Sequence, residues 1–164
     1  MLFNAPFRLG PFIVDAEGRL CPSTSERFPS FRVAWRGHVV RARLTATEPD
    51  GGTLALQTVL GRVPSTGRPE GAGALPRRAA FAAMRALPGT LPPGWTVVLL
   101  PDHRVLAEAK TRLLLPTSAE DLVGELALFL LRLVPYLELL AEGVGIEPAG
   151  DGAAAPGSLK TCPG

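Results

Sequence analysis

The chain of 164 residues is poor in cysteine and histidine, and each shortage excludes a class of protein. Its two cysteines, Cys21 and Cys162, are far apart in the sequence, which excludes a fold built on a framework of disulfides. Its two histidines, His38 and His103, are also isolated from each other. No cluster of His, Cys, Asp and Glu with metal-ligand spacing occurs, so no metal site is predicted.

The usual signatures of catalysis and cofactor binding are missing as well. Residues 71–73 lack the Lys-Ser/Thr ending of a phosphate-binding loop, and no Gly-x-Ser-x-Gly elbow occurs. The hydroxyl residues 23–25 have no evident base to activate them. We therefore predict no catalytic residue and no cofactor.

A long uncharged apolar run is also absent. The most apolar stretch, residues 122–140, contains Glu125, Arg132 and Glu138, which argue against a membrane span. Residues 1–6 carry no charged region followed by an apolar one, so we expect no signal peptide. We expect a cytoplasmic location and no membrane partner. Of the 17 basic residues only Lys110 and Lys160 are lysines, which is typical of a GC-rich bacterial genome.

Charge is nearly balanced overall but unevenly distributed. The net charge is +2, yet residues 1–115 hold 15 basic against 8 acidic residues and residues 116–164 hold 2 against 7. This asymmetry either attracts a charged partner or helps two parts of one molecule to dock, and we favour the second interpretation.

Alternating hydrophobicity predicts strands in the first half of the chain. Residues 7–14 read as one strand, a turn follows at 15–18, and a return strand begins at 19–20. Two further strands follow. The first covers residues 31–46 with a turn or bulge at 36–37, and the second covers residues 53–60, so that residues 38–60 form a hairpin around the loop at 48–52. Alternation places these apolar residues on one face of each strand: Phe31, Val33, Trp35; Val40, Ala42, Leu44, Ala46; Leu54, Leu56, Leu60.

The second half predicts two helices around a second hairpin. Residues 76–87 form an amphipathic helix with Ala80, Phe81, Met84 and Leu87 on its apolar face. The continuous apolar run 95–100 is typical of a central strand, and residues 104–115 return beside it. A capping box of Thr117 and Glu120 begins a helix over 118–141.

These elements predict one α+β domain over residues 1–142. Because hairpins link the successive strands, we expect an antiparallel sheet with the helices on one face, in the order β-β-β-β-α-β-β-α. Within it, residues 61–75 are rich in Gly and Pro and predict a flexible loop. Residues 143–164 have the composition of a disordered tail.

The helix over 118–141 has a wider apolar arc than contact with one sheet face requires. The excess must be covered by the rest of the chain or by a second copy, and we favour a homodimer. The residues predicted at the dimer interface are Leu126, Phe129, Leu130, Leu133 and Leu137.

Four arginines near the first hairpin raise the alternative of a nucleic-acid surface. Arg32, Arg36, Arg41 and Arg43 could share one sheet face, but alternation points Phe31 and Trp35 away from Arg32 and Arg36. Aromatic and basic side chains then lie on different surfaces, so nucleic acid is not expected as a partner. The strip of Phe31, Val33 and Trp35 is instead our candidate binding site for a protein, with ordinary core packing as the alternative.

The order of elements resembles the bacterial secretion-chaperone-like fold, which includes type III secretion chaperones and related putative sensory transduction regulator domains. The resemblance is carried by the hairpin 38–60, the helix 76–87, the hairpin 95–115 that opens Trp95-Thr96-Val97, and the helix 118–141. The chain differs from those chaperones in two respects: a hairpin rather than a helix is expected at its N-terminus, and its pI is basic, at about 8.8.

That resemblance implies a homodimer that holds an extended segment of a partner protein by edge-strand addition. Two alternatives stay open. One is a regulatory or scaffold domain that binds a protein without chaperoning it, and the other is an unrecognised enzyme with a small-molecule pocket near residues 61–75.

Overall fold

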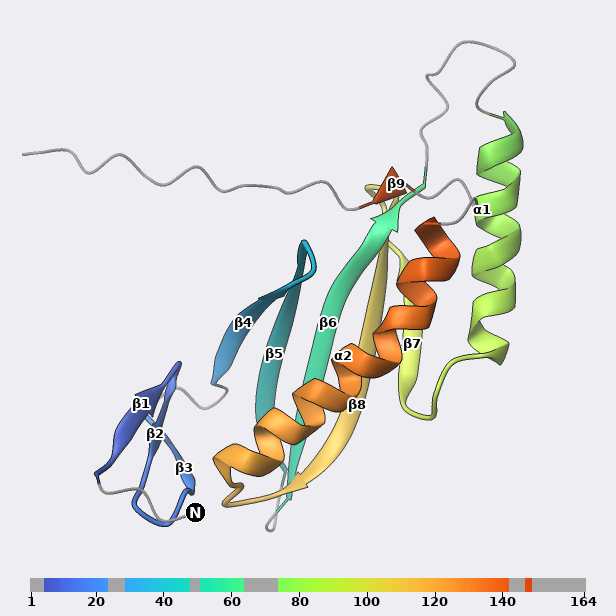
Figure 1. The fold of residues 1–164 in the computed structure, drawn as a ribbon. Helices are drawn as coiled ribbons and strands as arrows, with labels where there is room; N and C mark the ends of the chain where they lie inside the picture. The colour runs from blue at the N-terminus through green and yellow to red at the C-terminus, as the bar shows by residue number, and fades with distance from the viewer. Residues whose placement is uncertain (1–4, 24–28, 48–50, 64–73, 142–146, 149–164) are drawn as a thin grey trace, which may run out of the picture.

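The computed structural model describes residues 5–23, 29–47, 51–63, 74–141 and 147–148. They form antiparallel sheets and two α-helices, so the predicted α+β class is confirmed (Figure 1). Six strands precede the first helix, where the sequence indicated four. The difference arises at the N-terminus, where the chain reverses more often than its apolar pattern shows.

The N-terminal residues form a small separate sheet of three strands: β1 (Phe7–Leu9), β2 (Phe12–Val14) and β3 (Leu20–Pro22). The single strand predicted over 7–14 is wrong, because Gly10 adopts a φ of +57° and reverses the chain. The predicted turn at 15–18 is confirmed, since the Asp15 carboxylate accepts hydrogen bonds from the backbone N–H groups of Glu17 and Arg19.

The main sheet has the strand order β4-β5-β6-β8-β7, with β9 paired to the end of β6. Its long strands are β4 (Ser30–Trp35), β5 (His38–Thr47), β6 (Gly51–Arg62), β7 (Trp95–Leu99) and β8 (Arg104–Leu114). Arg36 and Gly37, both at positive φ, make a two-residue turn between β4 and β5. This turn explains why the hydrophobic pattern changes phase there.

The sequence predicted a central strand at the apolar run of β7, and this prediction is wrong. Among the described strands, β7 lies at the edge of the sheet and pairs with β8 alone, and its outward-facing Val98 is 48% exposed. β8 uses its other edge to pair with β6, which lies much earlier in the chain. Local hydrophobicity reports burial of side chains but does not report which strand pairs with which.

The two helices are α1 (Ala74–Ala86), followed by the 3-10 turn η1 (Leu87–Gly89), and α2 (Ala119–Ala141). The cap of α2 is Ser118 rather than the predicted Thr117, because the Asp121 N–H donates to Ser118 Oγ at 3.0 Å. Ala80 of α1 and Leu87 of η1 are buried, and Phe81 and Met84 of α1 are half-buried, as the predicted apolar face required.

Helix α2 runs across one face of the main sheet, and α1 stands beside β7 (Figure 1). Phe129 of α2 stacks on Trp95 of β7 with 4.8 Å between ring centroids, and Leu133 is fully buried. The Tyr136 hydroxyl donates to the Thr90 carbonyl at 2.6 Å, which ties α2 to the turn before β7. The core lies between this helix and the sheet, and no described helix covers the other face of the sheet.

The two segments predicted to be flexible fall largely outside the described residues. The structure does not describe residues 64–73 of the loop 61–75 or most of the tail 143–164. Within the tail, however, β9 (Glu147–Pro148) pairs with Gly61 and Arg62 at the end of β6. The disorder expected for the tail therefore does not apply to these two residues, which take part in a backbone ladder.

Candidate functional site

The predicted partner strip lies on the edge strand β4. Phe31, Val33 and Trp35 are all half-buried and point to the face of the sheet that α2 covers, opposite buried Ala42 and Val40 on β5. Phe31 and Trp35 pack against the core. The rings of Phe31 and Phe12 are in edge-to-face contact, with 6.2 Å between their centroids. The strip is therefore intermediate between core and open surface, since α2 runs over other strands.

The backbone along β4 is paired on one side. Ser30 to Trp35 pair with β5, and no other described strand pairs with β4. The small sheet lies near the Phe31 end of β4, whereas the Trp35 end is farther from it (Figure 1). An edge strand with an unpaired ladder is a ready template for a further strand.

Helix α2 places its predicted interface residues against its own sheet. Phe129 and Leu133 are buried, and Leu126, Leu130 and Leu137 are half-buried and packed against the core. Contacts within the chain therefore occupy much of the face that the sequence assigned to a second copy.

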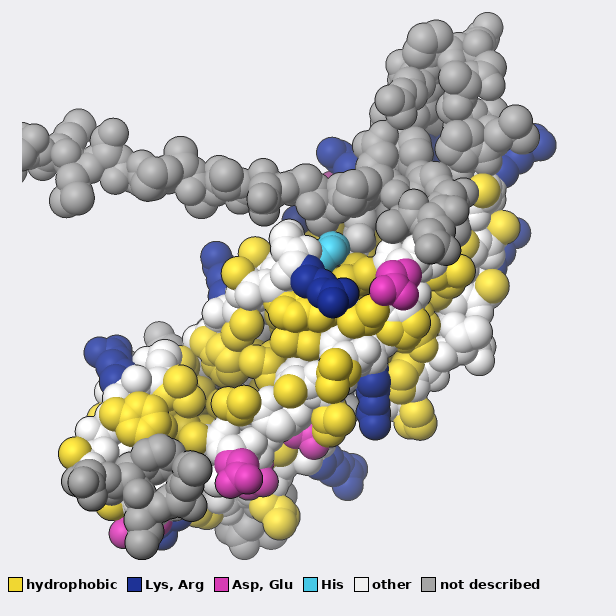
Figure 2. Space-filling view, in the orientation of Figure 1, with side chains coloured by type: hydrophobic (Ala, Val, Ile, Leu, Met, Phe, Trp, Pro, Cys, Tyr) yellow, Lys and Arg dark blue, Asp and Glu magenta, His cyan; other side chains and the backbone are white. Residues whose placement is uncertain are grey.

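The opposite side of α2 exposes a different set of apolar residues: Val123 53%, Leu128 46%, Leu131 67% and Leu139 50%. Leu128, Leu131 and Leu139 fall within one arc of the helix at 100° per residue. Figure 2 shows a broad apolar surface over α2 and the neighbouring strands. Sequence periodicity indicated the excess of apolar residues on this helix, but it did not separate the buried leucines from the exposed ones.

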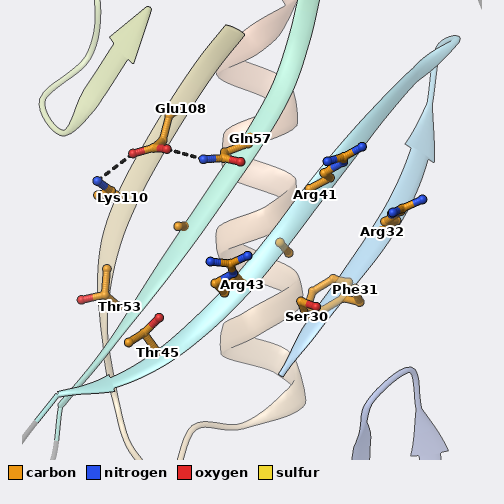
Figure 3. Close-up of a pocket in the computed structure, with 12 residues that line it drawn as sticks. Ser30, Phe31, Arg32, Arg41, Arg43, Thr45, Thr53, Gln57, Glu108 and Lys110 are labelled. Atoms are coloured by element: carbon orange, nitrogen blue, oxygen red, sulfur yellow. Dashed lines mark hydrogen bonds and ion pairs between the residues drawn. The ribbon is translucent and has the colours of Figure 1, made fainter. Parts of the chain in front are cut away.

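On the face of the main sheet away from α2, the pairing of β4, β5, β6 and β8 places charged and polar side chains next to one another. Arg32 lies opposite Arg41, Arg41 opposite Gln57, and Gln57 opposite Glu108. One row further along, Arg43 and Lys110 flank Ala55. These residues line a hollow of about 730 Å³, which we call the basic hollow; Figure 3 shows it with α2 behind the sheet.

The sequence anticipated only part of the basic hollow. Arg32, Arg41 and Arg43 share the face as alternation indicated, but Arg36 lies in the turn with its guanidinium 5.0 Å from the centre of the Trp35 ring. Lys110 was missed because only the pairing of β6 with β8 brings it beside Ala55. The alternation along β8 was the available sequence signal, because it places Lys110 on the face of the strand away from the buried Ala107 and Ala109.

Of the described residues that line the basic hollow, Glu108 is the one acidic residue. Its carboxylate accepts a hydrogen bond from Gln57 and pairs with Lys110 at 2.7 Å. Lys110, and then Gln57, hold the pKa of Glu108 below its usual range, against the opposing effect of burial. Glu108 is thus ionised at neutral pH, and its charge is shared with Lys110.

No arrangement for catalysis emerges among the described residues. None of their His, Cys, Asp and Glu side chains gather in groups of three or more that could hold a metal ion. His38 Nδ1 lies 3.0 Å from the Val59 carbonyl, and Asp102 pairs with Arg104 in the turn after β7. These are contacts of a structural kind within strands and turns.

Two surfaces on opposite faces of the sheet are therefore open to partners. One combines the β4 strip with the outer side of α2, and the other is the basic hollow. In the part of the chain that the structure describes, no helix is both long and apolar enough to cross a membrane. Comparison with protein-family models, with curated proteins and with solved structures gives no match for this chain.

Proposed function

We propose that the chain is a non-enzymatic protein-binding domain that holds an extended segment of a partner protein along β4. The observation that carries this proposal is the position of β4: it is an edge strand whose inward side chains, Phe31, Val33 and Trp35, are only half-buried. An added strand would take its affinity from backbone hydrogen bonds and its selectivity from contact with this strip.

The register of the β4–β5 hairpin indicates which backbone groups are available. Trp35 and His38 flank the two-residue turn and form the hydrogen-bonded pair next to it. The following pair, Ala34 with Val39, is then a non-hydrogen-bonded pair, so the N–H and C=O of Ala34 point away from β5. By the same alternation, Arg32 offers the next outward pair of groups.

A homodimer is part of the proposal, with a changed interface. Because Phe129 and Leu133 are occupied within the chain, the contact between copies uses the outer side of α2, with Leu128, Leu131 and Leu139. An isologous contact between two such helices would cover apolar side chains that are otherwise half-exposed or more.

The proposal agrees with what the resemblance to secretion chaperones implies: a cytoplasmic bacterial homodimer that binds a client protein. A regulatory or scaffold domain that binds without chaperoning is the main alternative, and a small-molecule enzyme is the other. Capture from the native host followed by mass spectrometry separates them. A secreted client supports the chaperone, a signalling protein supports the regulator, and a bound metabolite without a protein supports the enzyme.

The sharpest test of the binding mode is Ala34→Pro, with Ala34→Thr as the matched control. Proline removes the outward N–H but leaves the bonds between β4 and β5, and an edge strand tolerates it there. Threonine keeps the N–H and suits a strand. We expect Ala34→Pro to lose the captured partner and Ala34→Thr to keep it. Equal capture by both variants would show that no strand is added at this edge.

A further inference from the structure

The basic hollow has no assigned role, and it lies on the opposite face of the sheet from the β4 strip and α2. We propose that it binds an acidic segment of a polypeptide, laid along β6 between the arginines of β5 and Lys110 of β8. The inference rests on the side chains of Arg41, Arg43 and Lys110, whereas the proposed function rests on the backbone of β4 and its apolar strip.

The shape of the hollow follows from side-chain length. Thr53, Ala55 and Gln57 of β6 form its floor, and Arg41, Arg43 and Lys110 on the neighbouring strands form its walls. Adjacent strands are about 4.8 Å apart, so the two walls rise from strands about 10 Å apart. Figure 3 shows the arginines on β5 and Lys110 on β8, with β6 between them.

The arginines of the hollow have no side-chain partner among the described residues, whereas Lys110 pairs with Glu108. The side chains of Arg32, Arg41 and Arg43 make no hydrogen bond or ion pair with any described residue, although Arg32 and Arg41 lie opposite each other on neighbouring strands. Glu108, the only acidic side chain among the described lining residues, already interacts with Lys110 and Gln57. Like charges directly opposite one another destabilise a sheet, so an anion bound here would relieve an existing repulsion.

The spacing of the cations matches an extended acidic segment. Arg41 and Arg43 are alternate residues on β5, and Lys110 lies across β6 from Arg43. Alternate side chains of a strand lie about 7 Å apart, which is also the repeat of an extended peptide with an acid at every second residue. Arginine binds a carboxylate through two parallel hydrogen bonds, which fixes the position of each acid.

The absence of aromatic rings from the floor favours a peptide over a nucleic acid. Surfaces that bind single strands combine a basic groove with rings on which bases stack. Trp35 and Trp95 both point to the α2 side of the sheet, and Phe31, at the rim of the hollow, packs its ring against Phe12. The floor of Thr53, Ala55 and Gln57 offers short side chains and hydrogen-bonding groups instead.

Fluorescence anisotropy on the full chain tests the proposal. The probe is a labelled peptide of about ten residues that alternates Glu and Ser, used in about 20 mM salt so that charges are weakly screened. We expect it to bind, and we expect Arg41→Gln with Arg43→Gln to weaken binding by about tenfold or more. The matched control is Arg78→Gln with Arg85→Gln, which removes the same charge from exposed positions on α1.

Three outcomes would overturn the proposal. They are no binding of the acidic peptide, an equal loss in the α1 control, and tighter binding of an oligothymidine of the same charge. The last outcome would assign the hollow to nucleic acid. Misfolding is checked by melting, since removal of unpaired arginines should leave the melting temperature unchanged or raise it. A Trp35→Ala variant should bind the peptide as the wild type does, which separates this proposal from failure of the β4 site.

Discussion

Arg32 on β4 lies directly opposite Arg41 on β5, and both guanidinium groups project from the face of the sheet that α2 does not cover. No described carboxylate pairs with either of them. Among the described residues, nothing therefore offsets the repulsion between these two charges at this cross-strand position.

Arg41→Glu should stabilise the isolated protein. An opposite-charge pair across two strands contributes about 0.2–1 kcal/mol, and the variant replaces a repulsive pair with an attractive one. Urea unfolding in low salt should show a higher free energy of unfolding than the wild type. The gain should shrink in high salt, because exposed charges are screened there. A lower stability in low salt would mean that Arg41 has a partner that stabilises the fold.

Trp35→Ala separates binding from packing at the β4 strip. A fully buried tryptophan lost to alanine costs about 3–5 kcal/mol, and because Trp35 is half-buried we expect about 1–3 kcal/mol. Partner capture should be lost, since the largest side chain of the strip is removed. Thermal melting and capture are measured on the same preparation. A loss of stability as large as that for a buried tryptophan, with capture retained, would make the strip ordinary core.

Leu131→Glu tests the outer side of α2. The wild type should give a mass of about 35 kDa by light scattering, twice the 17.3 kDa chain, and the variant should give the monomer mass. Leu131 is 67% exposed, so the substitution should change monomer stability by no more than about 0.5 kcal/mol.

The matched control for this experiment is Leu114→Glu, which puts the same charge at an 83% exposed leucine on β8. It should leave the mass of the dimer unchanged. A wild-type monomer at micromolar concentration would contradict the homodimer, and dissociation by both variants would contradict the assignment to α2.

Glu108→Gln should make stability less sensitive to acid. Lys110, and then Gln57, hold the pKa of Glu108 in the folded protein below the usual value of 4.5. The ionised carboxylate therefore stabilises the fold above that value, and this contribution is lost as the pH falls through the lowered pKa. For an ion pair open to solvent the effect is about 0.2–1 kcal/mol.

The measurement is urea unfolding of the wild type and Glu108→Gln at pH 7 and at about pH 3. The wild type should be the more stable of the two at pH 7, and the difference should shrink at the lower pH. Glu138→Gln, at an exposed position on α2, is the control and should follow the wild type. A difference between wild type and Glu108→Gln that grows on acidification would contradict the pairing with Lys110.

Much of the fold could be predicted because it depends on neighbours in the sequence. Alternation along β5 and β6 separated buried Val40, Ala42 and Leu54 from their polar neighbours, since successive side chains of a strand point to opposite faces. The α+β class followed from the same periodicities. The candidate strip on β4 could also be named, because its three apolar residues share one face by the same rule.

Tertiary structure alone decided which segments became neighbours. The apolar run of β7 looked central, yet β8 pairs with β6 on its other side and leaves β7 at the edge. The same pairing brings Lys110 beside Ala55 and completes the basic hollow. Pairing and register between distant strands are settled by packing of the whole core, which no local pattern encodes.

For α2 as well, the sequence determined one property and the tertiary structure determined another. The sequence by itself determined that this helix carries more apolar surface than one sheet face can cover. Only packing against Trp95 decided that Phe129 and Leu133 turn inward, while Leu128 and Leu131 remain exposed. A helix that is apolar over most of its circumference can be rotated about its axis with little change in burial, so contacts with the sheet, rather than periodicity, fix the side that faces solvent.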